Sequence, residues 1–269
     1  MKAIFRFLSL AFAAASLIIL TNCNQTPNAN TTSNSSPGVE SSPTATTADN
    51  TTSEGNEDVE YMTKLGLMKG HMLVAKELLD LGKADQAEPH VGHPIEEIYS
   101  DVEDQLQGRN VPEFKTELTQ LHDLVKSNPK DAKLQTNFAQ SMEAIDKAIE
   151  VLPESQRQSP EFILQVMNRL LETAGAEYEA AIADGKFSEI IEYQDSRGFI
   201  NYTDSLYKSI SGQLSKDNSE VEKVITQTMT QLKTAWPSAL APEKPVLPPE
   251  KVTELIETIE ENSQKVIKG

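Results

Sequence analysis

The sequence predicts an all-α protein: an antiparallel helical bundle, built as one large bundle or as two stacked bundles. Apolar residues recur every three or four positions through most of the chain beyond residue 58. Prolines and glycines fall at the ends of these periodic segments, and no long run of β-branched residues alternates with polar ones. The body over 59–269 is long enough for one large helical domain or two small ones.

Residues 1–22 have the three parts of an export signal. Lys2 and Arg6 precede an apolar run over 7–20, and a processing site follows. The apolar run is about fourteen residues long, shorter than the roughly 20 that a bilayer-spanning helix needs. We therefore expect a signal peptide that is removed rather than a permanent membrane span.

Cys23 directly follows this signal, and it is the chain's only cysteine, so no disulfide framework is available. Residues 20–23 resemble the bacterial lipobox, although Asn22 stands where Gly, Ala or Ser is usual. The alternative is an ordinary cysteine in a poorly cleaved signal. We expect Cys23 to carry acyl chains such as palmitate and to tether the protein to a membrane of the bacterial cell envelope, facing the periplasm or the exterior.

The segment 23–58 is rich in Asn, Thr, Ser and Pro and has almost no large apolar side chains, so we expect a disordered linker. The net charge of the whole chain is −17. Loss of Lys2 and Arg6 with the signal would lower it by two, to −19. This balance disfavours nucleic acid as a partner and permits cations.

The helices of the body follow from apolar periodicity and from the breaks between periodic segments. In one example, Phe138, Met142, Ile145 and Ile149 share a helix face. We expect helices at 59–81, 85–91, 94–107, 112–127, 131–151, 160–184, 188–214, 218–235 and 249–267, with 237–248 as a proline-rich connector.

Prolines and glycines mark where these helices begin and end. Pro112, Pro160 and Pro249 each suit a first helical turn, and Gly82, Gly108 and Gly185 each suit a C-terminal cap. The links around Gly82, 128–130 and Gly185 are short, which predicts antiparallel helix hairpins.

The most informative chemistry lies around the first of these turns. His71 is eleven residues before Gly82 and His93 is eleven after it, so an antiparallel hairpin brings them to about the same level. His90, Glu96 and Glu97 lie three or four residues from His93 and share its helix face. Together they predict a nitrogen and oxygen site for iron, copper or zinc.

A packing role for the same residues is the alternative. His71 falls inside an apolar stripe, where an imidazole needs a polar partner, and one of the glutamates could be that partner. Glu96 and Glu97 also suit the positive end of a helix dipole.

A second polar cluster is predicted at Glu192, Asp195 and Arg197. The two carboxylates, three residues apart, would co-ligate a cation or pair with Arg197 of a neighbouring turn. Gly198 inside the same helix indicates either a close helix contact or a kink.

Several blocks resemble an uncharacterised family of exported all-helical bacterial proteins: 65–71, 90–94 with 97–99, 192–199 and 235–237. This resemblance implies the fold and the export but no activity. A weaker likeness is to the imelysin-like periplasmic proteins of iron uptake, whose hallmark is Gly-x-His-x-x-Glu. Here Gly92, His93 and Glu96 give Gly-His-x-x-Glu, one residue shorter.

No enzyme motif stands out: the sequence has no zinc hydrolase His-Glu-x-x-His, no phosphate-binding glycine loop and no partnered serine elbow. We therefore expect a noncatalytic, lipid-anchored envelope protein. The leading hypothesis is that it binds a transition metal through the His and Glu cluster. The alternative is a helical adaptor that binds another envelope protein and holds no metal.

Overall fold

The computed structural model describes residues 48–269, with side chains from residue 55 onward. The predicted signal peptide, Cys23 and most of the predicted linker lie outside these residues. The described part of the chain is helical almost throughout, which confirms the all-α fold class. Helix α1 (Ala48–Asp80) begins well before residue 59, so the end of the predicted linker is helical. Within 48–269, no helix combines the length and the apolar character needed to cross a membrane.

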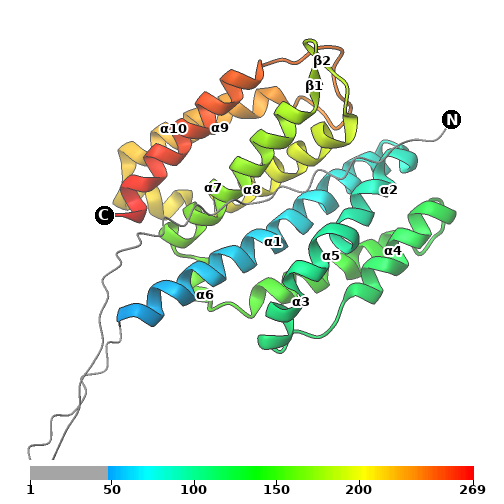
Figure 1. Cartoon of the computed structure of the whole chain (residues 1–269), viewed down its shortest axis with the longest axis horizontal. Helices are drawn as coiled ribbons and strands as arrows, with labels where there is room; N and C mark the ends of the chain where they lie inside the picture. Colours follow the sequence, from blue (N-terminus) through cyan, green and yellow to red (C-terminus); the bar gives the residue numbers. More distant parts are fainter. Residues whose placement is uncertain (1–47) are drawn as a thin grey trace, which may run out of the picture. The chain divides into compact units, whose positions relative to one another are not determined.

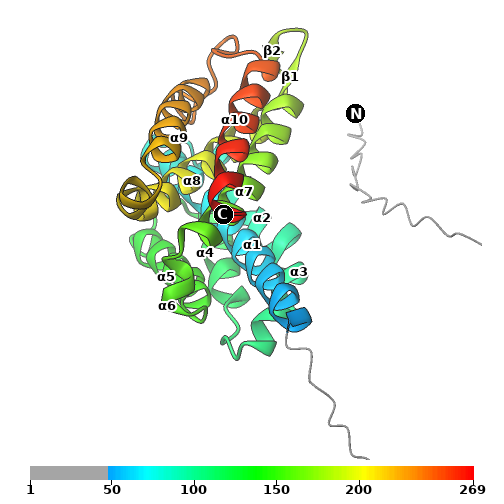
Figure 2. The ribbon, with the colours of Figure 1, turned by 90° about the vertical axis from the view of Figure 1, so that its left-hand side faces the viewer.

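Two groups of helices pack against each other within the folded unit (Figures 1 and 2). In the first group, α1 packs on α2 and α5, and α4 packs on α2 and α5. Its members are α1, α2 (Ala84–His93), a π-helical turn (Pro94–Ile98), α3 (Tyr99–Gly108), α4 (Lys115–Ser127) and α5 (Leu134–Glu150).

The second group is a four-helix bundle in which each helix follows its neighbour in the sequence. It contains α7 (Pro160–Ala180), α8 (Ile190–Asp217), α9 (Ser219–Leu232) and α10 (Pro249–Ile267), where α10 returns to pack on both α7 and α9. A short helix, α6 (Glu154–Arg157), precedes it, and a 3-10 turn (Lys233–Ala235) follows α9. Helix α1 also contacts α7 and α8, so it joins the two groups.

Several predicted boundaries need correction. Helix α4 begins at Lys115 rather than at Pro112, because the Glu113 carboxylate accepts a hydrogen bond from the Thr116 amide at 3.0 Å and caps the helix there. Gly185 ends no helix: α7 stops at Ala180, and two short strands, β1 (Ile182–Ala183) and β2 (Lys186–Phe187), form a hairpin. Asp184 and Gly185 both have positive φ, as a tight hairpin turn requires.

Two further turns differ from expectation. After α3 the positive φ falls on Asn110 rather than near Gly108, whereas Gly82 has the expected φ of +70°. Pro94 lacks an amide hydrogen but does not end the helical segment, because it is the first residue of the π-helical turn that connects α2 to α3.

Helices α1 and α8 approach closely at a pair of glycines. A Cβ on Gly198 would overlap the carbonyl oxygen of Gly70, and a Cβ on Gly70 would lie 2.5 Å from a ring carbon of Phe199. Only glycine permits this contact between two helix backbones, so Gly198 marks a close helix contact. The contact lies beside His71 in α1 and three residues after Asp195 in α8.

We predict that Gly198→Ala lowers the free energy of unfolding by about 1–3 kcal/mol, because the methyl group forces the two helices apart. The matched control is Gly212→Ala in the same helix, where no atom lies within 4 Å of an added Cβ. That control should gain up to about 1 kcal/mol from helix propensity. Urea denaturation of the two variants measures both effects, and equal stabilities would contradict the close contact.

Candidate metal site

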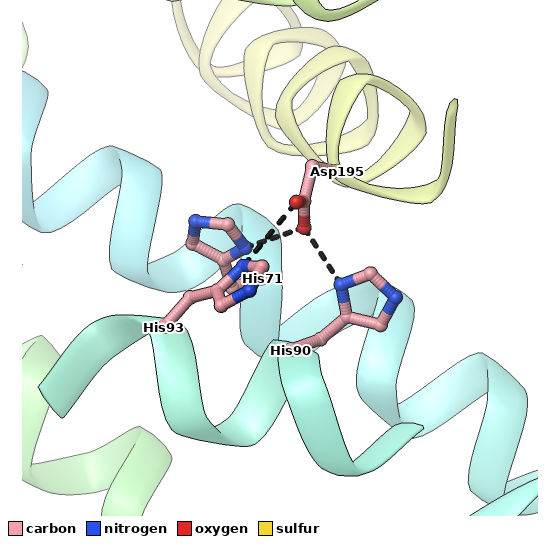
Figure 3. Close-up of side chains that lie close together, drawn as sticks. All are labelled: His71, His90, His93 and Asp195. Carbon is pink, nitrogen blue, oxygen red and sulfur yellow. Dashed lines mark hydrogen bonds and ion pairs between the residues drawn. The ribbon is translucent and has the colours of Figure 1, made fainter. Parts of the chain in front are cut away.

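Three histidines and one aspartate converge where the two helix groups meet (Figure 3). His71 comes from α1, His90 and His93 from α2, and Asp195 from α8. One potential ligand atom from each residue lies within 4.8 Å of the others. Three histidines thus meet an aspartate that lies more than a hundred positions after them in the sequence.

The Asp195 carboxylate is the centre of this cluster. Its Oδ1 atom lies 2.6 Å from Nδ1 of His71 and 2.6 Å from Nδ1 of His90. Its Oδ2 atom lies 3.3 Å from Nδ1 of His93. All three imidazoles therefore turn the same ring nitrogen toward one carboxylate.

The cluster is largely buried. His90 is fully buried, and His71 and Asp195 are each 4% exposed. The His71 and His93 rings meet edge to face with centroids 4.9 Å apart, and Phe199 meets the His71 ring at 4.9 Å from another side. Met68 and Met72, which flank His71 in the sequence, belong to the apolar core around α1.

His93 carries a buried polar atom without a hydrogen bond. Its Nδ1 atom is near Asp195 but makes no hydrogen bond within the described residues. Buried side-chain nitrogens are nearly always paired, so an unpaired one calls for a ligand or an ion. This atom faces the same carboxylate as the other two Nδ1 atoms.

Charge and burial act against each other in the cluster. Burial opposes ionisation of Asp195, but the charge and hydrogen bond of His71, the hydrogen bond of His90 and the 3.3 Å contact with His93 outweigh it and hold the pKa of Asp195 well below its usual value. Burial also opposes the charge of His93, but the Asp195 carboxylate raises the pKa of His93 to about 9. The site therefore strongly favours a positive charge beside Asp195.

Three glutamates surround the His93 side of the cluster. Glu97 follows His93 by one turn, with Oε1 4.0 Å from Nε2 of His93. Burial and the charges of Asp195, Glu192 and Glu97 raise the pKa of Glu177 in α7 to about 7. Burial and Asp195 also raise the pKa of Glu192. The electrostatic field on the His93 side of the cluster is negative and attracts cations.

The structure joins residues that the sequence placed in two separate clusters. Asp195, from the second predicted cluster, lies among the histidines of the first. Glu96 and Glu97 are exposed on the π-helical turn, and the inner carboxylate is Asp195 instead. Glu177 was not predicted, because its place on α7 beside the site depends on how the helices pack.

Arg197 does not pair with Glu192 or Asp195; its partners are Glu77 in α1 and the loop after α9. Its guanidinium binds Glu77 in a bidentate pair, with Nε 2.8 Å from Oε2 and Nη2 3.0 Å from Oε1. It also donates to the carbonyl oxygen of Trp236. Arg197 of α8 therefore connects the loop after α9 to α1.

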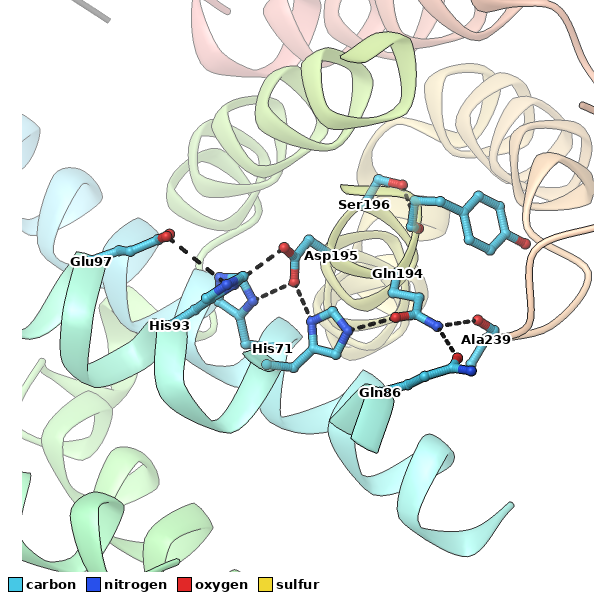
Figure 4. Close-up of polar contacts among 10 residues, drawn as sticks. His71, Gln86, His93, Glu97, Gln194, Asp195, Ser196 and Ala239 are labelled. Carbon is cyan, nitrogen blue, oxygen red and sulfur yellow. Dashed lines mark hydrogen bonds and ion pairs between the residues drawn. The ribbon is translucent and has the colours of Figure 1, made fainter. Parts of the chain in front are cut away.

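A polar chain runs from the cluster to the same loop (Figure 4). Nε2 of His90 lies 2.9 Å from Oε1 of Gln194, and the Gln194 amide nitrogen donates to the carbonyl of Ala239 at 3.0 Å. The same nitrogen donates to Gln86 Oε1 at 2.9 Å. Every hydrogen-bonding group in this chain is buried or half-buried.

The residues present fit a transition metal. Zinc and related ions bond to His nitrogen and carboxylate oxygen at about 2.0–2.2 Å, so two ligand atoms on one ion lie at most about 4.2 Å apart. Ligand atoms already within 4.8 Å of one another reach such an ion by small side-chain rotations. Three imidazoles with one carboxylate form a donor set for zinc, iron or copper.

Comparison with known proteins finds a similarity for the second helix group. Residues 153–269 match the family model of the iron permease-associated 4-helix bundle domain. No curated protein and no solved structure matches the chain. The matched region contains α6 to α10 and supplies Asp195, Glu177 and Glu192, whereas the three histidines lie before it. In this chain a region similar to the iron permease-associated 4-helix bundle domain thus meets three histidines from a preceding helix group.

Proposed function

We propose that this protein binds one transition metal ion through His71, His90, His93 and Asp195. The observation that carries the proposal is the convergence of three imidazole Nδ1 atoms on one buried carboxylate, one of them without a hydrogen bond. A buried charged cluster of this kind destabilises a fold unless each charge is compensated. A divalent cation at the centre compensates the carboxylate and gives the third imidazole a partner.

Iron is the metal that we place first. The family model that matches 153–269 is named for its association with an iron permease. The likeness of Gly92, His93 and Glu96 to the imelysin-like hallmark points toward iron uptake as well. The donor set also suits zinc and copper, so the metal preference is a matter for measurement.

We further propose that the protein is a noncatalytic metal handler attached to the cell envelope through Cys23. The export signal and the lipobox-like segment support this location. The negative charge around His93 supports capture of a cation rather than of an anionic partner. A helical adaptor for another envelope protein is the alternative that applies if the site holds no metal.

We predict that the protein purified without a histidine tag binds one equivalent of Fe²⁺ or Zn²⁺. His71→Ala and His93→Ala should each weaken binding by more than about 100-fold, because removing a ligand costs more than removing an outer hydrogen-bond partner. The matched control is His122→Ala. His122 is in α4, its Nε2 atom lies 2.8 Å from Oε1 of Glu88, and it does not belong to the cluster. Anaerobic titration with a competing chelator measures all four proteins.

Either of two results would contradict the site. One is wild-type protein with no stoichiometric metal. The other is loss of binding in His122→Ala that equals the loss in His71→Ala.

Metal affinity should depend on pH through His93. The pKa of His93 rises from its ordinary 6.5 to about 9 on folding, so its proton stabilises the metal-free fold fully below pH 6.5. This contribution is lost as pH rises through 9. A metal ion takes this nitrogen only after the proton leaves, so metal affinity should rise between pH 6.5 and 9.

His93→Gln is the control for this titration, because glutamine keeps a polar side chain and does not titrate. Its metal affinity should be lower and its pH dependence shallower. Calorimetry in two buffers at each pH counts the protons released. An affinity for the wild type that does not change from pH 6.5 to 9 is the contrary outcome.

Removal of Cys23 should release the protein from the membrane. Cys23→Ser, expressed in a bacterium that lipidates such proteins, should move the protein from the membrane fraction to the soluble envelope fraction, because acyl chains provide the attachment. Metal binding should not change, since Cys23 lies outside the described cluster. Fractionation measures the location of the protein, and mass spectrometry of the N-terminal peptide measures acylation of Cys23. A wild-type protein found unacylated in the soluble fraction rules out the anchor.

A further inference from the structure

The geometry points to Gln194 as the residue that chooses which nitrogen of His90 binds the metal. We propose that Gln194 holds the ring hydrogen of His90 on Nε2 and thereby leaves Nδ1 as the ligand atom. This inference rests on the proposed metal site and adds a positioning residue to it. Gln194 itself is 1% exposed and lies next to the four-residue cluster without belonging to it.

The orientation of the Gln194 amide follows from its other neighbour. Its Nε2 atom lies 3.0 Å from the carbonyl oxygen of Ala239, which can only accept a hydrogen bond. The amide nitrogen must therefore face Ala239, and Oε1 must face His90. Because Oε1 also can only accept, the 2.9 Å contact requires a hydrogen on Nε2 of His90.

The carbonyl that sets this orientation is itself held in place. Ala239 is fully buried, and its amide donates to Oε1 of Glu77 at 3.1 Å. Glu77 is held by the bidentate pair with Arg197, which also binds the Trp236 carbonyl. The loop after α9 is thus fixed at both 236 and 239, and it presents a rigid acceptor to Gln194.

The consequence for the site is a defined ligand atom. With a hydrogen fixed on Nε2, only Nδ1 of His90 can offer a lone pair to a metal. In the metal-free fold this atom donates a hydrogen to the ionised Asp195 carboxylate at 2.6 Å, beside Nδ1 of His71. A metal ion bound here takes the place of that hydrogen, while the hydrogen on Nε2 stays with Gln194. Outer partners of this kind orient a metal-binding histidine, and their loss typically weakens metal affinity by roughly 10–100-fold.

The test compares Gln194→Met with Gln86→Met in the full chain. Methionine has nearly the volume of glutamine and cannot accept the His90 hydrogen bond, so Gln194→Met should weaken Zn²⁺ affinity by about 10–100-fold. Gln86→Met removes only the second acceptor of the Gln194 amide and leaves the link from His90 to Ala239. That control should change affinity by less than about threefold.

A spectroscopic readout separates positioning from simple packing. In protein labelled with ¹⁵N-histidine, wild-type His90 should show a slowly exchanging hydrogen on Nε2 with or without Zn²⁺, and with Zn²⁺ the shift of Nδ1 should become that of a metal-bound nitrogen. Gln194→Met should lose the protected Nε2 hydrogen. If that variant does not fold, the wild-type spectrum alone decides.

The outcomes distinguish this inference from the proposed function. Wild-type protein that binds no metal yet shows the protected Nε2 hydrogen overturns the metal site, and only the hydrogen bond from His90 to Gln194 stands. Zn²⁺ bound through Nε2 of His90, or a Gln194→Met variant with unchanged affinity and spectrum, overturns the role of Gln194 and leaves the metal site standing.

Discussion

The arrangement of this protein depends on one buried carboxylate, Asp195, held by three imidazoles. Such a group is stable inside a fold only when its charge is met by hydrogen bonds or by opposite charge. Here all three imidazoles come from the other helix group, so the interaction links α8 to α1 and α2. Leaving the carboxylate unpaired would cost roughly 3–5 kcal/mol, a large part of a typical stability.

The close contact of Gly70 with Gly198 makes this pairing possible. Side chains at this crossing would hold the helices apart and carry Asp195 away from His71. The same crossing joins the region that matches the iron permease-associated bundle to the helices that carry the histidines. The site therefore belongs to neither helix group alone, and its ligands meet only when both are folded and in contact.

Much of the fold follows from sequence because helix formation is local. Apolar spacing placed α10 over 249–267 at its observed bounds, and Pro160 and Pro249 lie in first helical turns as expected. The predicted helix ends are wrong where a hydrogen bond or a turn at the end of the helix, rather than the apolar spacing, sets the boundary. Glu113 caps α4 after Pro112, and an Asp184 and Gly185 turn forms a strand hairpin where a longer α7 was expected.

The candidate site was only partly accessible to sequence reasoning. His71 and His93 are equally far from Gly82 along the sequence, which predicts that they lie at the same height in a helix hairpin. This prediction is possible because it depends only on the local turn. Which side chains contact Asp195 depends on how α8 crosses α1. No rule of residue spacing predicts a contact between residues 124 positions apart. The glycine at 198 was the available signal of a close crossing, and combining it with Asp195 three residues earlier would have suggested that the two polar clusters face each other.

The most direct test of the metal site is anomalous X-ray diffraction from crystals of the metal-loaded protein, with data collected on both sides of the metal absorption edge. We predict one strong peak bounded by the Nδ1 atoms of His71, His90 and His93 and by the Asp195 carboxylate. Fully loaded crystals with no peak there, or with the ion bound only at the exposed glutamates, would contradict it.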